Sequence, residues 1–192
     1  SAIEKIFKFN KKVFEIIVID DNSTDGTIDT VKLLVQQKSN LKLNIRSNLR
    51  KNLAESINLG IRQAQYENII WMDADFQHPP IYIQEFIKKS DRFDVIICSR
   101  FLKGSERYFK DENSNKDINE NQSYIFNQIC KVLLYKDITD YTSGYICIKK
   151  KIFKNFKLSG FYGDYFVNLL TYLKRNNFNI IEIPFKDEIR AS

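Results

Sequence analysis

Short apolar runs that end abruptly in acidic residues recur along the chain. Residues 13–19 form a run rich in β-branched side chains that stops at Asp20 and Asp21, and residues 69–72 form one that stops at Asp73. A short apolar run bounded by such a break is typical of a buried strand. The two runs therefore predict two strands, each followed by an acidic loop.

Apolar positions at helical and strand spacing alternate through the rest of the sequence. Further strands are expected over residues 41–45, 94–98, 145–148 and 179–184, the last as an edge strand ended by Pro184. Helices are expected over residues 1–12, 28–35, 52–65, 80–88, 124–135 and 163–175. Strands that alternate with helices predict an α/β domain of three layers, α/β/α, with a mostly parallel sheet.

The acids at the strand ends are the first candidate chemistry. Right-handed crossovers would place Asp20, Asp21, Asp73 and Asp75 on one rim of the sheet, where ligands of α/β proteins bind. Asp73, Asp75 and Gln77 alternate, so in extended backbone their side chains share one side. Three oxygen ligands suit Mg²⁺ or Mn²⁺. The alternative is a strand end with solvated acids.

Composition narrows the class of protein. A length of 192 residues, with 43% hydrophobic and 14% aromatic residues, indicates one globular domain over 1–192. The net charge of +6 favours anionic partners such as nucleotide phosphates or an acidic membrane surface. No zinc-finger spacing or RNA-binding signature is present, so nucleic acid is not an expected partner. The three cysteines are widely spaced and are expected to be buried free thiols.

Residues 103–122 interrupt the pattern. This segment is charged and rich in Asn, with few aliphatic residues, and predicts a mobile loop. It is either a solvated excursion or a functional lid. The two ends of the sequence break off within predicted elements, which suggests a domain truncated at both ends. No apolar run is long enough to span a membrane, so docking on a membrane surface is the expected mode of association.

Six motifs, in order, resemble those of one enzyme family. They are V-I-D-D-N-S-T-D-G-T at 18–27, W-M-D-A-D-F-Q-H-P-P at 71–80, C-S-R-F at 98–101, D-Y-T-S-G-Y at 140–145, G-D-Y-F at 163–166 and I-I-E-I-P-F at 180–185. Together they resemble family 2 glycosyltransferases of the GT-A fold. The second motif is most similar to the branch that contains the dolichyl- and polyprenyl-phosphate mannose synthases.

The resemblance implies a role for each matched residue. Asp20 and Asp21 would form the nucleotide loop, with Asp21 on the base or ribose side. The metal ligands would be Asp73, Asp75 and Gln77, with Asp73 also on the nucleotide-sugar side and Asp75 counted among the catalytic residues.

The remaining matched residues lie later in the chain. Arg100 and Arg190 would meet phosphates, and Asp140, Thr142 and Ser143 would line the sugar and acceptor region. Asp140 is the candidate base for a hydroxyl acceptor, although a helix-capping turn residue explains it equally well. The single histidine, His78, is better explained as a loop residue that orients the Pro turn.

Two departures from the family pattern matter. The family's first strand does not appear before Ser1, so the resemblance implies a GT-A fold that lacks that strand. Asn119, Glu120, Asn121 and Gln122 replace the basic residues that relatives carry before the helix at Tyr124, which puts a phosphate contact there in doubt.

The resemblance implies an inverting, metal-dependent enzyme that transfers mannose or glucose from a nucleotide-diphosphate sugar to polyprenyl phosphate, at the cytoplasmic face of a membrane. Two alternatives stay open. They are a family 2 transferase that acts on a cell-surface glycan and a catalytically silent fragment that binds nucleotide.

Overall fold

The computed structural model describes residues 2–9, 13–47, 50–75, 77–105, 118–160 and 163–186. Its strands are β1 (Ile16–Asp20), β2 (Leu41–Ile45), β3 (Asn68–Trp71), β4 (Val95–Ser99), β5 (Ile146–Lys149) and β6 (Ile180–Pro184). Its α-helices are α1 (Ala2–Phe9), α2 (Thr27–Gln37), α3 (Leu53–Gln63), α4 (Ile83–Lys89), α6 (Ile118–Leu133) and α7 (Asp164–Arg175). Two short 3-10 helices, η1 (Pro80–Tyr82) and η2 (Lys150–Lys154), precede α4 and follow β5.

The strands form two groups. β1 pairs with β2 in parallel, and the other four follow the order β3-β5-β4-β6. β5 runs antiparallel to both of its neighbours, whereas β4 and β6 are parallel. β3, β4 and β6 therefore share one direction, and the predicted mostly parallel sheet has β5 as its exception. Among the strands that the structure describes, β6 pairs with β4 alone, as expected for an edge strand.

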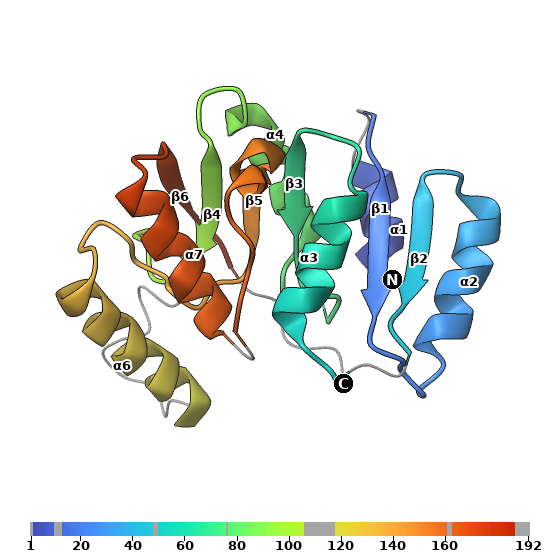
Figure 1. Cartoon of the computed structure of the whole chain (residues 1–192), viewed down its shortest axis with the longest axis horizontal. Helices are drawn as coiled ribbons and strands as arrows, with labels where there is room; N and C mark the ends of the chain where they lie inside the picture. Colours follow the sequence, from blue (N-terminus) through green and yellow to red (C-terminus); the bar gives the residue numbers. More distant parts are fainter. Residues whose placement is uncertain are drawn as a thin grey trace.

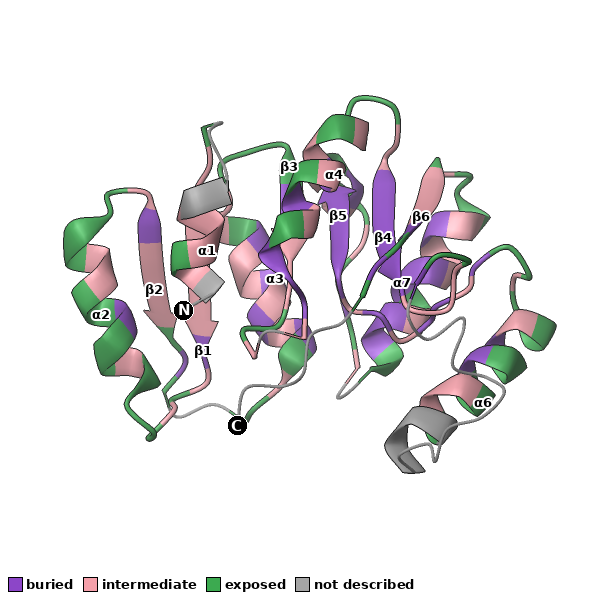
Figure 2. Ribbon diagram, turned by 180° about the vertical axis from the view of Figure 1, so that it is seen from behind, coloured by how far each residue is buried: buried purple, intermediate pink, exposed green. Residues whose placement is uncertain are grey.

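Helices cover both faces of the strands. In Figure 1, α3 and α7 lie in front of the strands, α1 and α4 lie behind them, and α2 stands beside β2 at the outer edge; Figure 2 shows the same arrangement from the other side. This arrangement is the predicted α/β/α sandwich. Among the described helices, none has the length and apolar character needed to cross a bilayer.

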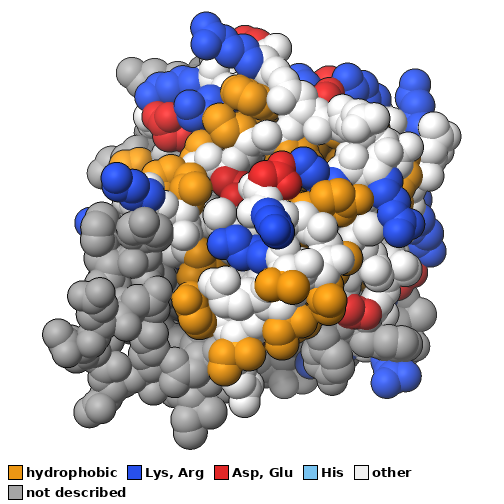
Figure 3. All heavy atoms as spheres, turned by 90° about the vertical axis from the view of Figure 1, so that its left-hand side faces the viewer, with side chains coloured by type: hydrophobic (Ala, Val, Ile, Leu, Met, Phe, Trp, Pro, Cys, Tyr) orange, Lys and Arg blue, Asp and Glu red, His pale blue; other side chains and the backbone are white. Residues whose placement is uncertain are grey.

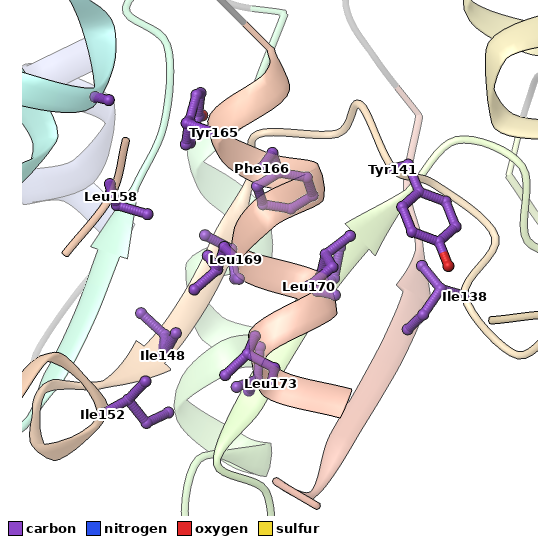
Figure 4. Packing of buried hydrophobic residues seen from close by; sticks show 14 of the residues in the cluster. Ile138, Tyr141, Ile148, Ile152, Leu158, Tyr165, Phe166, Leu169, Leu170 and Leu173 are labelled. Carbon is purple, nitrogen blue, oxygen red and sulfur yellow. The ribbon is translucent and has the colours of Figure 1, made fainter. Parts of the chain in front are cut away.

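The main core lies between α7 and the four-stranded group. α7 places Phe166, Leu169 and Leu173 against Ile148 of β5, and all four side chains are at most 1% exposed (Figure 4). Burying a side chain of this size stabilises the fold by about 1.5–3 kcal/mol relative to exposure. The motif residues Asp73 and Arg100 follow the ends of β3 and β4, and residues of both strands belong to this core.

A cleft of about 670 Å³ separates the two strand groups. Residues of both β1 and β3 line it, among them Ile17, Ile19, Ile69 and Ile70. Within the described residues β1 pairs only with β2 and β3 only with β5, so each has one edge without a strand partner. The cleft lies where a sheet continuous across both groups would hold another strand.

Other sequence-based expectations differ in outcome. Cys98, Cys130 and Cys147 are buried free thiols, as predicted. The loop predicted over residues 103–122 ends earlier than expected, because α6 already begins at Ile118. Residues 106–117 lie outside the described part of the chain, so the expectation of mobility stays a prediction there.

Candidate active site

The carboxyl ends of most strands meet at one edge of the molecule. Figure 1 shows β1, β2, β3, β4 and β6 pointing toward the lower edge, so the loops after them open on the same side. Asp20 is the last residue of β1 and is buried, and its Oδ1 accepts a hydrogen bond from the Ser23 amide at 2.7 Å. Asp20 therefore shapes the turn after β1, the role that the resemblance implied.

Asp21 is held by the protein. Its Oδ1 lies 2.8 Å from Nη1 of Arg46, and it also accepts hydrogen bonds from the Ser56 hydroxyl and the Asn52 amide. Arg46 is buried and donates in addition to the Asn52 carbonyl. This network joins the loop after β1 to the start of α3, so the orientation of Asp21 is set before any ligand binds.

The D-A-D segment is not a continuation of its strand. β3 ends at Trp71, and Ala74, Asp75, Gln77 and His78 lie in bends. The premise that an extended backbone aligns the three oxygen ligands was therefore wrong. The Gln77 amide donates to Oδ1 of Asp75 at 3.1 Å, which turns the chain back on itself. Curvature of the loop, rather than strand alternation, places these side chains.

The donor set still fits a hard divalent cation. Asp73 is exposed, Asp75 and Gln77 are half-buried, and all three carry oxygen donors on one short loop. In the described part of the chain, no three His, Cys, Asp or Glu side chains group closely enough to hold a metal. A complete site on this loop would therefore need the Gln77 amide, substrate oxygens or water besides the two carboxylates.

His78 connects the D-A-D loop to the loop before β5. Its Nδ1 accepts a hydrogen bond from the Asp73 amide at 2.9 Å, and its ring stacks on Tyr145 with centroids 4.8 Å apart. Burial lowers the pKa of His78, and it also hydrogen-bonds the Ser143 backbone. The histidine is thus a buried structural bridge, and the explanation favoured from the sequence fits its position.

Arg100 and Asp140 form a two-pronged ion pair. Nε and Nη2 of Arg100 donate to the two carboxylate oxygens of Asp140 at 2.8 and 2.9 Å, and Nη2 also donates to the Thr142 hydroxyl at 2.7 Å. The Asp140 side chain is fully buried and that of Arg100 is 15% exposed. A fork of this kind fixes the plane of the guanidinium group.

The electrostatics of Asp140 argue against proton abstraction. Burial by itself would raise the pKa of Asp140, but the Arg100 guanidinium and hydrogen bonds from Arg100 and Thr142 hold that pKa below its usual value. A carboxylate that keeps its charge so firmly is a weak proton acceptor at neutral pH. Its geometry suits the orientation of Arg100 better than it suits base catalysis.

Two residues of this network were not predicted as site residues. Glu182 of β6 accepts hydrogen bonds from the amides of Thr139 and Asp140 at 2.8 and 3.0 Å. Asn127 of α6 donates to the Thr142 hydroxyl at 3.0 Å and is 1% exposed. The I-I-E-I-P-F motif contains Glu182, but no sequence pattern indicated that β6 would pass beside the Asp140 loop.

The other predicted site residues have different placements. Ser143 is buried, and its hydroxyl donates to the Cys98 carbonyl, so it stabilises the join between β4 and the loop before β5. Arg190 lies outside the described residues, and its role stays a prediction.

Comparisons with known proteins agree with this geometry. The sequence profile described as "Glycosyl transferase family 2" matches residues 1–156. This chain belongs to glycosyl transferase family 2. The loops after β1 and β3 and the Arg100–Asp140 pair are the candidate site region within this family 2 domain.

Among curated relatives, the family 2 chain is 29% identical to a dolichol-phosphate mannosyltransferase of Pyrococcus furiosus, over 93% of this chain and 49% of that protein. It is 35% identical to the putative glycosyltransferase CsbB of Bacillus subtilis, over 54% of this chain and 31% of that protein. The chain thus spans about half the length of the mannosyltransferase and a smaller share of CsbB.

Solved structures show the same fold. Glucosyl-3-phosphoglycerate synthase from Mycobacterium tuberculosis, in complex with phosphoglyceric acid, superposes with a TM-score of 0.72 at 14% identity. The match covers 99% of the family 2 chain and 66% of the other. Another structure of that synthase holds Mn²⁺ and UDP-glucose and matches with a TM-score of 0.69 at 14% identity. The likeness confirms the GT-A fold.

Proposed function

We propose that this domain is an inverting glycosyltransferase that moves mannose or glucose from a nucleotide-diphosphate sugar to polyprenyl phosphate at the cytoplasmic face of a membrane. The observation that carries the proposal is one hydrogen-bonded assembly. His78 ties the D-A-D loop to the loop before β5, and Asp140 of the same inter-strand segment holds Arg100. The carboxylates of Asp73 and Asp75 and the guanidinium of Arg100 thereby lie at the same edge of the sheet.

Each part of the assembly has a role toward the donor. Asp20 and Asp21 would shape the pocket for the nucleoside, because their loop is fixed by Ser23 and Arg46. Arg100 would contact a phosphate group, since its donors form a rigid fork that stays charged. Thr142, which accepts a hydrogen bond from Arg100, would line the sugar side, with Ser143 supporting it from the core.

A divalent cation, Mg²⁺ or Mn²⁺, would be held by Asp73, Asp75 and Gln77 and would neutralise charge on the departing diphosphate. The protein's own contribution is to hold the loop in its bent form through the Gln77 and His78 contacts. Support for the metal comes from the donor chemistry of the loop and from the fold, which it shares with a synthase whose structure holds Mn²⁺.

The low pKa of Asp140 supports a phosphate acceptor. A sugar hydroxyl needs a base to remove its proton, whereas a lipid phosphate carries an ionised oxygen near neutral pH, with a second pKa of about 6. With Asp140 committed to Arg100, catalysis would rest on positioning and on stabilisation of charge. Relation to a dolichol-phosphate mannosyltransferase, at 29% identity, points to the same acceptor class.

Binding of the donor nucleotide is the first test. Calorimetry with GDP and with UDP, with and without Mn²⁺, should show binding that Mn²⁺ strengthens. Asp75→Asn should weaken Mn²⁺-dependent binding by about tenfold or more, because a lost metal ligand or its support typically changes affinity by 10–100-fold. Asp29→Asn on α2 is the matched control, since its side chain is 84% exposed and lies outside the site. Equal binding by both variants would contradict the metal assignment.

Transfer is the second test. Radiolabelled sugar from GDP-mannose or UDP-glucose should enter the organic phase when polyprenyl phosphate is supplied. Label that appears only on a water-soluble glycan would favour the cell-surface alternative instead. Nucleotide binding without transfer to any acceptor would identify a silent domain. The protein should be assayed with whatever sequence flanks it in its gene, because this chain spans about half of the related mannosyltransferase.

A further inference from the structure

Helix α6 presents an apolar face to solvent. Most surface helices bury their apolar side and expose their polar side. In α6 and the residue just after it, six large hydrophobic side chains are exposed. They are Ile125, Phe126, Ile129, Val132, Leu133 and Leu134, with exposed fractions from 39% to 76%. We call these six residues the α6 apolar face.

The spacing places five of these residues along one side of the helix, whereas Leu134 follows the last residue of α6 in line with its opposite side. Ile125, Ile129 and Val132 follow one another at intervals of four and three residues, which is the repeat of a single helical stripe. The opposite side carries Asn127 and Cys130, which are buried against the domain. An open hollow of about 320 Å³ is lined by Gln128, Ile129, Val132 and Leu133. Figure 3 shows hydrophobic side chains gathered in the lower part of this face of the molecule, with Lys and Arg side chains beside them.

Such a surface normally has an occupant. Soluble monomeric proteins rarely expose a contiguous apolar patch of this kind unless a partner or a membrane covers it. Other exposed large hydrophobic residues of the described chain, such as Leu33 on α2 and Val13, are not grouped on one helix in this way. A single exposed leucine on a protein surface is ordinary and needs no explanation, whereas the group of hydrophobic side chains on α6 does.

The composition of the face favours lipid over protein. Protein interfaces are enriched in Tyr, Trp and Arg, whereas five of the six side chains here are aliphatic. Basic residues are present at the C-terminal end of the helix, where Lys131 lies in the last turn. Lys136 is exposed just beyond α6, and exposed Lys103 follows Phe101, whose ring lies 6.0 Å from that of Tyr124. With the net charge of +6, this combination is typical of helices that lie in an anionic membrane surface.

The buried side of the same helix contacts the candidate active site. Asn127 donates to the hydroxyl of Thr142 at 3.0 Å and accepts from the amide of Tyr141 at 2.5 Å. Thr142 in turn accepts from Nη2 of Arg100. Two side chains, Asn127 and Thr142, thus connect α6 to the Arg100–Asp140 pair.

We infer that the α6 apolar face is a membrane-docking surface that lies in the lipid interface and holds Arg100 at the level of lipid phosphate groups. Docking on anionic lipid follows from the surface of α6 alone. Delivery of a lipid phosphate acceptor to Arg100 rests in addition on the proposed function. The surface would let this domain take its acceptor from the bilayer without extracting the lipid chain into water.

Vesicle flotation tests docking without any need for catalysis. The protein should float with vesicles of phosphatidylcholine and phosphatidylserine, and less with vesicles of phosphatidylcholine alone. Val132→Lys should lower the partition coefficient by about tenfold or more, because about 0.8 kcal/mol is lost for each CH₂ group withdrawn from lipid. Leu33→Lys is the matched control, since Leu33 is 61% exposed on α2 and Val132 is 76% exposed on α6. Lys136→Gln should weaken binding about fivefold and reduce its salt dependence.

The outcomes separate docking from the proposed function. Equal flotation of the wild type and Val132→Lys would overturn the inference, as would concentration-dependent dimerisation that Val132→Lys abolishes in the absence of vesicle binding. Calorimetric nucleotide binding should be the same in Val132→Lys and the wild type, which shows that the variant is folded. Vesicle binding that depends on Val132 but comes without sugar transfer would support docking and refute the enzymatic proposal.

Discussion

The two strand groups differ sharply in how firmly they are packed. β4 is buried along its whole length and β5 along most of it, whereas β1 and β2 are mainly half-buried. The difference follows from position: β4 and β5 are central strands with helix on both faces, while β1 borders the cleft and pairs on one side only. The group with the Arg100–Asp140 pair is therefore the more deeply buried part of the domain, and the group with Asp20 and Asp21 is the less deeply buried part.

The ion pairs of Arg100 and Arg46 show the same contrast between individual side chains. Arg100 pairs with a carboxylate that is 0% exposed, and Arg46 pairs with Asp21, which is 23% exposed. Each arginine has a further acceptor, the Thr142 hydroxyl for Arg100 and the Asn52 carbonyl for Arg46. Loss of the acid should therefore matter more at Arg100 than at Arg46.

The largest expected effect is that of Asp140→Asn. It replaces one acceptor oxygen by an NH₂ group that faces the Arg100 donors, and it leaves a mostly buried guanidinium, 15% exposed, without its counter-charge. Unfolding free energy should fall by about 3–5 kcal/mol, the usual effect of breaking a buried pair from one side. Asp21→Asn should lower it by about 1–2 kcal/mol, because water and Asn52 still reach Arg46. Urea denaturation measures the unfolding free energy of both variants. Equal losses would contradict the expected difference between the Arg100–Asp140 and Arg46–Asp21 pairs.

A matched pair of leucine truncations probes the packing itself. Leu169→Ala in α7 removes a fully buried side chain from the main core, so unfolding free energy should fall by about 3 kcal/mol. Leu34→Ala in α2 removes a half-buried one beside the two-stranded group and should lower it by about 1 kcal/mol. Thermal and urea unfolding supply the measurement. A larger loss of unfolding free energy in Leu34→Ala than in Leu169→Ala would contradict the assignment of the main core to the four-stranded group.

Glu182 gives the smallest effect, and this effect depends on pH near neutrality. Burial raises the pKa of Glu182 to about 7, above the value of 4.5 expected for an unfolded chain. Because the folded state binds this proton more tightly, the stabilisation is complete below about pH 4.5 and is lost as pH rises toward 7 and beyond. The stability advantage of the wild type over Glu182→Gln should therefore be larger at pH 5 than at pH 8.

Titration of Asp140 does not overlap with that of Glu182 in this pH range. Its pKa lies below the usual value, so its contribution is lost only as the pH falls into the acid range. Denaturant midpoints of both proteins at pH 5, 6, 7 and 8 supply the comparison. A difference between wild type and variant that stays constant across this range would show that Glu182 is ionised throughout. Glu182 would then orient the Thr139 and Asp140 amides without responding to pH.

Much of the fold could be predicted because local patterns determine it. The strands at 41–45 and 180–184 and the helix from residue 164 to 175 match the expected segments to within one residue, since each has a regular apolar repeat. The D-A-D loop was misjudged for the same reason. Strand alternation was extended past Trp71, where hydrogen bonds from Gln77 and to His78 impose bends that no periodicity reveals.

The family, the acidic loops and the candidate site residues could be predicted from the sequence, because motifs are local and ordered along the chain. Which of these residues contact one another depends on the tertiary structure. Asp140 and Arg100 are 40 positions apart, and Glu182 lies a further 42 beyond Asp140, yet they meet in one buried network. Burial turned Asp140 from a candidate base into a partner of Arg100, because a charge inside the fold must be paired. The outward turn of the α6 apolar face was likewise set by what the opposite side of that helix packs against.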